Sequence, residues 1–251
     1  MSYTGVTING TDTLEEWGLI LEGDLTIGEA KLKETWVDVP GANGALNLSY
    51  VTTDGEPVYE MREISFTLFA SGLGRSGGSL THGTPPDEAA VNLIRTQLQG
   101  LYHGREVELI LPDDPTHFFK GVLSVGAKSK FNSGRIPITV KAYPYRLKNT
   151  LTQVEMISGY NPDQDLVNNG LIRVVPEVRV TFDESNPPIS IRIYKVSPSP
   201  TQSWTILQSQ NYTEQYPYLR GLYLYPGTTS IHMEPNQNNN RVIFTYREGR
   251  L

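Results

Sequence analysis

The chain has 251 residues, of which 38% are hydrophobic and 19% charged, so it is long enough for one large or two small domains and too apolar to be disordered. Its net charge of −6 is opposite in sign to that of a protein that coats nucleic acid. The absence of cysteine excludes disulfides and thiolate metal sites. The N-terminus is polar and no apolar run approaches the roughly 20 residues that span a bilayer, so we expect neither a signal peptide nor membrane insertion.

Alternation of apolar and polar residues with a period of two is the dominant pattern, and it predicts β-strands. Residues 36–39 and 45–50 alternate on either side of a turn at Pro40–Gly44, which predicts a β-hairpin. Three further runs have apolar residues at every second position: Ile64, Phe66, Leu68 and Ala70; Val107, Leu109 and Leu111; and Ile136, Ile138, Val140 and Ala142. We expect each of these strands to pack one face on a core.

One helix is predicted between these strands. Thr84 is the expected N-cap, with Pro85 at the first helical position and Asp87 three residues after the cap. Apolar residues then follow at helical spacing: Val91, Ile94, Leu98 and Leu101. This stripe predicts a helix that lies against the sheet and ends at Gly100 or Gly104.

The composition changes near Pro144, which predicts a first domain of residues 1–146 and a second domain of residues 147–251. Residues 148–165 are polar and predict a linker or a peripheral pair of strands. Short apolar segments follow, separated by turns that contain Pro or Gly: 171–182, 189–193, 204–207, 219–225, 231–233 and 242–246. They predict a small β-sandwich without a helix. Two paths are open to the residues after Val242, which stay with the second domain or return to the first.

A G-x-G-x-x-G pattern at Gly72, Gly74 and Gly77 follows the strand that ends at Ala70. In a dinucleotide-binding site this pattern joins a strand directly to a helix. Here a further polar loop precedes the predicted helix, and the neighbouring strands resemble antiparallel hairpins. The interpretation that we favour is a flexible loop, with no bound cofactor.

Asp113, Asp114 and His117 are the strongest candidates for metal ligands. Their segment is also a strong turn sequence, because Asp side chains cap backbone amides and Pro fixes φ. The turn explains each of these residues without a ligand. The sequence contains no HExxH motif and no G-x-S-x-G elbow. We therefore expect no metal, no cofactor, no catalytic residue and no enzymatic activity.

Tyrosines gather beside Trp204 in the second domain. Aromatic side chains with a polar end suit saccharides and protein interfaces. The candidate contacts to a saccharide or a partner are Trp204, Tyr212, Tyr216 and Tyr218. Tyrosine also favours strands, so a structural role is the interpretation that we prefer.

Short segments follow one another in a characteristic order along nearly the whole chain. In the first half they include Trp17-Gly18-Leu19, Val37-Asp38-Val39-Pro40-Gly41, Leu111-Pro112-Asp113-Asp114-Pro115 and Ala142-Tyr143-Pro144-Tyr145. In the second half they include Asn168-Asn169-Gly170, Leu224-Tyr225-Pro226-Gly227-Thr228 and Tyr246-Arg247-Glu248-Gly249-Arg250. The ordered set, with the chain length, resembles the distal tail protein (Dit) family of phages with long, non-contractile tails.

The resemblance implies a mainly β protein with two domains. An N-terminal split-barrel-like β domain with one α-helix would form a homo-hexameric hub ring, and a C-terminal galectin-like β-sandwich would project from it. The ring would lie at the tail tip of the virion and join the tail tube protein to the tail-associated lysin or fibre. The long arm by which some relatives hold receptor-binding proteins is missing from this sequence, although such proteins and accessory baseplate proteins stay among the possible partners.

The same resemblance implies that DNA passes through the lumen of the ring during ejection. An acidic wall repels phosphate, so the charge of the chain agrees with conduction of DNA without sequence-specific binding. Synthesis would take place in the host cytoplasm.

Two segments are the candidate ring or tube contacts. They are the hairpin turn and the Gly-rich loop of the first domain, with the residues Pro40, Gly41, Asn43, Gly44, Gly72, Gly74, Arg75 and Gly77. Two other functions are weighed against the ring. The first is a carbohydrate-binding module or adhesin that uses the aromatic residues beside Trp204. The second is an enzyme that acts on cell-wall glycan, against which the lack of a catalytic constellation counts.

Overall fold

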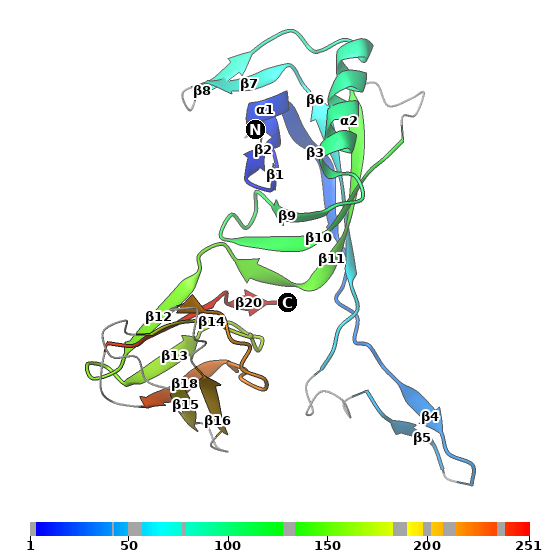
Figure 1. The fold of residues 1–251 in the computed structure, drawn as a ribbon. Coiled ribbons are helices and arrows are strands. Elements are labelled where there is room, and N and C mark those ends of the chain that lie inside the picture. Colours follow the sequence, from blue (N-terminus) through cyan, green and yellow to red (C-terminus); the bar gives the residue numbers. More distant parts are fainter. Residues whose placement is uncertain are drawn as a thin grey trace. The chain divides into compact units, whose positions relative to one another are not determined.

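The computed structural model describes residues 4–41, 43–49, 57–76, 79–127, 134–182, 190–197, 202–207, 214–234 and 239–251. Strands dominate this part of the chain, and only two helices occur in it. The chain divides into two compact units, Met1–Arg146 and Leu147–Leu251. Figure 1 gives the labels of the elements. The predicted mainly β fold is confirmed.

The first unit is built on one antiparallel sheet. The unit as a whole contains the strands β1 (Thr7–Ile8), β2 (Thr11–Asp12), β3 (Leu19–Ile27), β4 (Trp36–Asp38), β5 (Ala45–Asn47), β6 (Arg62–Ala70), β7 (Leu73–Ser76), β8 (Ser79–His82), β9 (Glu106–Ile110), β10 (His117–Val125) and most of β11 (Arg135–Lys148). The large sheet has the order β2-β1-β9-β10-β11-β6-β3. Two smaller sheets, β4-β5 and β7-β8, are separate hairpins.

The predicted apolar rows form the core of this unit. The alternating residues of β6, β9 and β11 are all buried, and Ile64, Leu109 and Ala142 have no exposed surface. Their register also places like rows opposite each other, with Leu68 paired to Ile136 and Ile64 paired to Val140. Because alternate side chains of a strand point to one face, a period of two in the sequence is enough to define this core.

Helix α2 (Glu88–Tyr102) lies where a helix was predicted, but its start and its buried face differ. Asp87 is the N-cap instead of Thr84, and its carboxylate accepts a hydrogen bond from Ala90 N at 2.8 Å. The reason is Pro86, because a proline disfavours helical geometry at the residue before it, which here is Pro85. The buried residues are Val91, Arg95, Leu98 and Tyr102. Of the predicted stripe, Val91 and Leu98 are buried and Ile94 packs partly buried against the core. Leu101 is 49% exposed, and Tyr102 is buried in its place.

The prediction of a single helix was wrong, because a second helix, α1 (Thr13–Trp17), precedes β3. The Asp12 carboxylate caps it by accepting hydrogen bonds from Leu14 N and Glu15 N. Gly18 ends it with a φ of 64°, in the left-handed region. Five residues are too few to show a helical period, so only the caps could have indicated this helix.

The second unit is a β-sandwich. Its strands are β12 (Thr152–Ile157), β13 (Asp163–Asn168), β14 (Glu177–Thr181), β15 (Ser190–Ser197), β16 (Gln202–Leu207), β17 (Glu214–Gln215), β18 (Gly227–Glu234) and β19 (Arg241–Tyr246). The short strand β20 (Gly249–Arg250) follows β19 and lies in neither sheet of the sandwich. One sheet has the order β12-β19-β14-β17 and the other β13-β18-β15-β16. Buried residues of both sheets form one cluster, in which Phe244 and Ile193 have no exposed surface. The two sheets therefore share a single core.

Two predictions for this unit need correction. Residues 148–165 are not a linker but contain the peripheral strand β12 and the start of the peripheral strand β13, which belong to two different sheets instead of pairing with each other. Residues 219–225 do not form a strand, although Leu219, Leu222 and Leu224 are buried. Leu224 makes only an isolated bridge to Val174. Apolar spacing correctly predicted burial here, but a ladder needs a neighbouring strand that this segment does not have.

Candidate assembly surface

A long β-ribbon of the first unit carries the hairpin β4–β5. Residues 28–33 and 58–63 run side by side: Gly28 N donates to Glu63 O at 2.7 Å, and Lys33 N donates to Val58 O at 2.7 Å. The ribbon continues into β4–β5, where Val37 lies opposite Leu46. Figure 1 shows these two strands at the end of the ribbon, apart from the large sheet of the unit.

The hairpin exposes its apolar side chains on both faces. Trp36 is 55% exposed and Leu46 is 54% exposed, and Val37 and Val39 are similarly open. The expectation that this alternating segment packs a face on a core was therefore wrong. A two-stranded ribbon is marginally stable by itself, and clustered exposed apolar side chains mark an interaction site.

The candidate residues of the hairpin turn lie at the tip. Pro40, Gly41, Asn43 and Gly44 are all exposed. Gly41 and Gly44 have φ values of 82° and 81°, which a side chain would strain. The two glycines therefore allow the tight return of the chain from β4 to β5.

The Gly-rich segment forms a hairpin instead of the predicted flexible loop. Gly74 pairs with Thr81 and Arg75 pairs with Leu80 in the β7–β8 ladder, whereas Gly77 lies outside the described residues. Gly72 closes the base of the hairpin, where its carbonyl accepts a hydrogen bond from Gly83 N at 2.8 Å. A Cβ at Gly72 would lie 2.7 Å from the Thr84 carbonyl. The glycine is needed for this close approach of two backbone segments.

The Asp-rich segment forms the predicted turn. Asp114 N donates to Leu111 O at 3.1 Å, and His117 N donates to Asp114 O at 3.3 Å. The Asp114 carboxylate also lies 3.1 Å from His117 Nδ1 and 3.2 Å from Arg146 Nη1. Asp113 is exposed. Among the described residues, no three His, Asp or Glu side chains are placed to hold a metal ion.

The aromatic candidates of the second unit do not share one role. Trp204 packs against the core of the sandwich, and its indole N–H donates to Arg220 O at 2.9 Å. Tyr216 and Tyr218 are 63% and 73% exposed. Tyr212 lies outside the described residues.

A polar row on the outer face of the β13-β18-β15-β16 sheet was missed by the sequence analysis. His232 Nδ1 lies 2.7 Å from an Asp163 carboxylate oxygen, and Tyr194 OH donates to Glu234 at 2.8 Å. Arg192 donates to Tyr194 OH at 3.1 Å, and this bond raises the pKa of Arg192. The signal was present, because these polar residues alternate with the predicted apolar residues Ile191, Ile193, Ile231 and Met233.

No protein-family model matches the chain, and no curated protein matches it. The crystal structure of the SPP1 Dit protein does match, with a TM-score of 0.62 over 98% of this chain and 99% of that chain. The chain has the fold of SPP1 Dit. The two sequences are 13% identical, so the likeness is one of fold. SPP1 Dit is described as a paradigm of the hub adsorption apparatus in phages that infect Gram-positive bacteria. No described helix of the present chain is long and apolar enough to cross a membrane.

Proposed function

We propose that this protein is a structural hub component of a phage tail tip. The observation that carries the proposal is the fold shared with SPP1 Dit over nearly the full length of both chains. Shared fold alone does not determine function. The order of sequence segments that resembles distal tail proteins is a separate argument for the same role.

In this proposal the first unit forms a homo-hexameric ring and the second unit, a galectin-like sandwich, projects from it. The ring joins the tail tube protein to the tail-associated lysin or fibre, and DNA passes through its lumen. Receptor-binding or accessory baseplate proteins are further partners. The net charge of −6 supports passage of DNA without binding, because like charges repel.

The β4–β5 hairpin is the contact that we assign to the ring. A ring requires a heterologous interface, in which one surface of a subunit meets a different surface of the next. The hairpin offers Trp36, Val37 and Leu46 to such a neighbour, and none of them is buried within its own chain. Burial of these side chains at the interface would supply the favourable free energy of association.

The experiment is the solution mass of the purified protein by light scattering, combined with negative-stain imaging. We expect a six-fold annulus and a mass near six times 28.0 kDa. The variant Trp36→Ser/Leu46→Ser is expected to be monomeric and to keep the circular dichroism spectrum of the wild type, because neither side chain is buried within its own chain. Its control is Leu207→Ser, which removes a side chain that is 67% exposed on the second unit.

A control variant that forms rings while the hairpin variant does not would support the assigned interface. Rings formed equally by both variants would contradict the hairpin contact and leave the ring intact. A wild-type chain that stays monomeric at every concentration, with no annular particles, would contradict the hexamer.

A carbohydrate-binding module or adhesin is the second candidate function. It is favoured by the polar row that contains Asp163, His232 and Tyr194, since arrays of donors and acceptors beside an aromatic ring suit polyhydroxylated ligands. A depression of about 480 Å³ lies beside this row, lined by Asp163, Asp165 and Ser230 among others. Binding of the full chain to a glycan array, lost in His232→Ala, would favour this function. An array without signal would count against it.

A further inference from the structure

Arg62 occupies a position in the core-facing row of β6. The row continues through Ile64, Phe66 and Leu68, all of which are buried. Arg62 itself is only 8% exposed. The alternation of β6 predicts an apolar residue at this position. Arg62 instead places a cationic guanidinium group at the end of an apolar row.

A second guanidinium lies against the same aromatic ring. Arg62 Cζ and Arg146 Cζ are each 5.7 Å from the centre of the Phe119 ring. Phe119 and Arg146 belong to β10 and β11, which lie in the same sheet as β6. The face of an aromatic ring attracts a cation, but two cations at one ring also repel each other.

In the part of the chain that the structure describes, Asp114 is the only carboxylate that pairs with either of the two arginines. Asp114 lies 3.2 Å from Arg146 and also contacts His117. Among the described residues no carboxylate pairs with Arg62, and the Nε groups of Arg62 and Arg146 are buried without a hydrogen-bond acceptor. Burial, and then the charge of Arg146, lower the pKa of Arg62.

A buried guanidinium without a partner is strongly unfavourable, because it loses hydration and gains no compensating bond. The guanidinium fork matches the oxygens of carboxylates and phosphates. We propose that Arg62 and Arg146 form an oxyanion-binding site of the first unit. The oxyanion is either free phosphate or the carboxylate of a second protein chain, since both offer anionic oxygens that accept hydrogen bonds from guanidinium N–H groups.

The test is a titration of the full chain with inorganic phosphate, and in parallel with acetate, at constant ionic strength. The readouts are the thermal transition and the NMR resonances of the arginine Nε–H groups. We expect the Arg62 and Arg146 resonances to shift and the transition temperature to rise by about 2–4 °C at saturation. A response to phosphate alone assigns a phosphate site, and a response to both anions assigns a site open to carboxylates.

The variant Arg62→Met should lose the response to both anions. Without added oxyanion it should be at least as stable as the wild type, because an apolar side chain replaces an uncompensated charge. A merely structural arginine would instead give a less stable variant. The control Arg241→Met removes an arginine that is 57% exposed and should keep the full response.

Unchanged Arg62 and Arg146 resonances in both anions would overturn the proposal, whatever the stability of the variant. A thermal response of equal size in wild type and Arg62→Met would also overturn it, since phosphate stabilises many proteins by exclusion from their surface. The wild-type resonances decide the matter even if Arg62→Met does not fold.

Discussion

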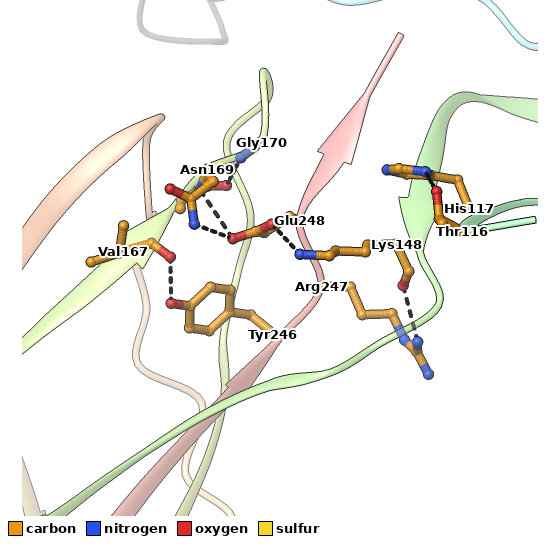
Figure 2. A network of polar contacts seen from close by, with 10 residues as sticks. Thr116, His117, Lys148, Val167, Asn169, Gly170, Tyr246, Arg247 and Glu248 are labelled. Carbon is orange, nitrogen blue, oxygen red and sulfur yellow. Dashed lines mark hydrogen bonds and ion pairs between the residues drawn. The ribbon is translucent and has the colours of Figure 1, made fainter. Parts of the chain in front are cut away.

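Glu248 binds Asn169 through both the backbone and the side chain of that residue. One carboxylate oxygen accepts hydrogen bonds from Asn169 N at 3.1 Å and from Asn169 Nδ2 at 2.9 Å. The other accepts from Lys148 Nζ at 3.0 Å (Figure 2). Three segments of the second unit, each distant from the others in sequence, are thus joined at one carboxylate.

This network gives a structural reason for two of the segments that resemble distal tail proteins. Asn168-Asn169-Gly170 and the closing segment that contains Tyr246 and Glu248 meet here. Tyr246 OH donates to Val167 O at 2.7 Å, and Gly249 O accepts from Leu171 N at 2.8 Å. The segments are needed together because each supplies the partners of the other.

The substitution Glu248→Gln should lower the free energy of unfolding by about 1–2 kcal/mol. An amide keeps an acceptor for Asn169 but loses the ion pair, and its own NH₂ group faces Lys148. The Lys148 side chain is 40% exposed, so solvent already weakens that pair. Urea unfolding measures the change. Glu155→Gln is the matched control, because it breaks an exposed pair with Arg241 and should change stability by less than about 0.5 kcal/mol.

The contribution of Glu248 should depend on pH. Burial raises its pKa, but the hydrogen bonds from Lys148 and Asn169 outweigh burial and hold the pKa below the ordinary 4.5. A carboxylate with a lowered pKa stabilises the fold above its unfolded-state pKa, and this stabilisation is lost as the pH falls through the folded-state value. The stability difference between wild type and Glu248→Gln should therefore be constant above about pH 5.5 and shrink below pH 4.5. A difference that does not change with pH would contradict the role of the carboxylate.

Gly72→Ala should destabilise the first unit by about 2–3 kcal/mol. Its φ of 71° strains any side chain, and a Cβ would lie 2.7 Å from the Thr84 backbone. Gly104→Ala is the matched control, because Gly104 has a φ of 72° and open space around it. It should cost only about 1 kcal/mol, the strain of the backbone alone. Equal losses in urea unfolding would show that the contact with Thr84 is unimportant.

Trp36→Ala should leave the free energy of unfolding within about 0.5 kcal/mol of the wild type, measured on the monomer. Trp36 is 55% exposed, and its hydrogen bond to Glu34 is also at the surface. By contrast, Phe66→Ala removes a ring that is 4% exposed and should cost about 3–5 kcal/mol. A large loss in the Trp36 variant would indicate that the hairpin packs within its own chain.

Alternation of apolar and polar residues was sufficient to predict the two cores. The rows of β6, β9 and β11 were predicted residue by residue, because alternation in a strand is a local property that needs no knowledge of its neighbours. The turn at Asp113 and Asp114 was found for the same reason, since Asp and Pro act on the backbone beside them.

Which face of a strand is covered depends on the elements that pack beside it in the folded chain. Val37 and Val39 are separated by a polar residue, as Ile64 and Phe66 are, yet the first pair is exposed and the second buried. A pattern divides a strand into two faces, but the neighbouring elements determine whether either face meets a core. The pairing of Asn169 with Glu248 and the meeting of Arg62 with Arg146 at Phe119 depend on the same condition. Contacts between residues far apart in sequence form only when the whole sheet brings their strands together.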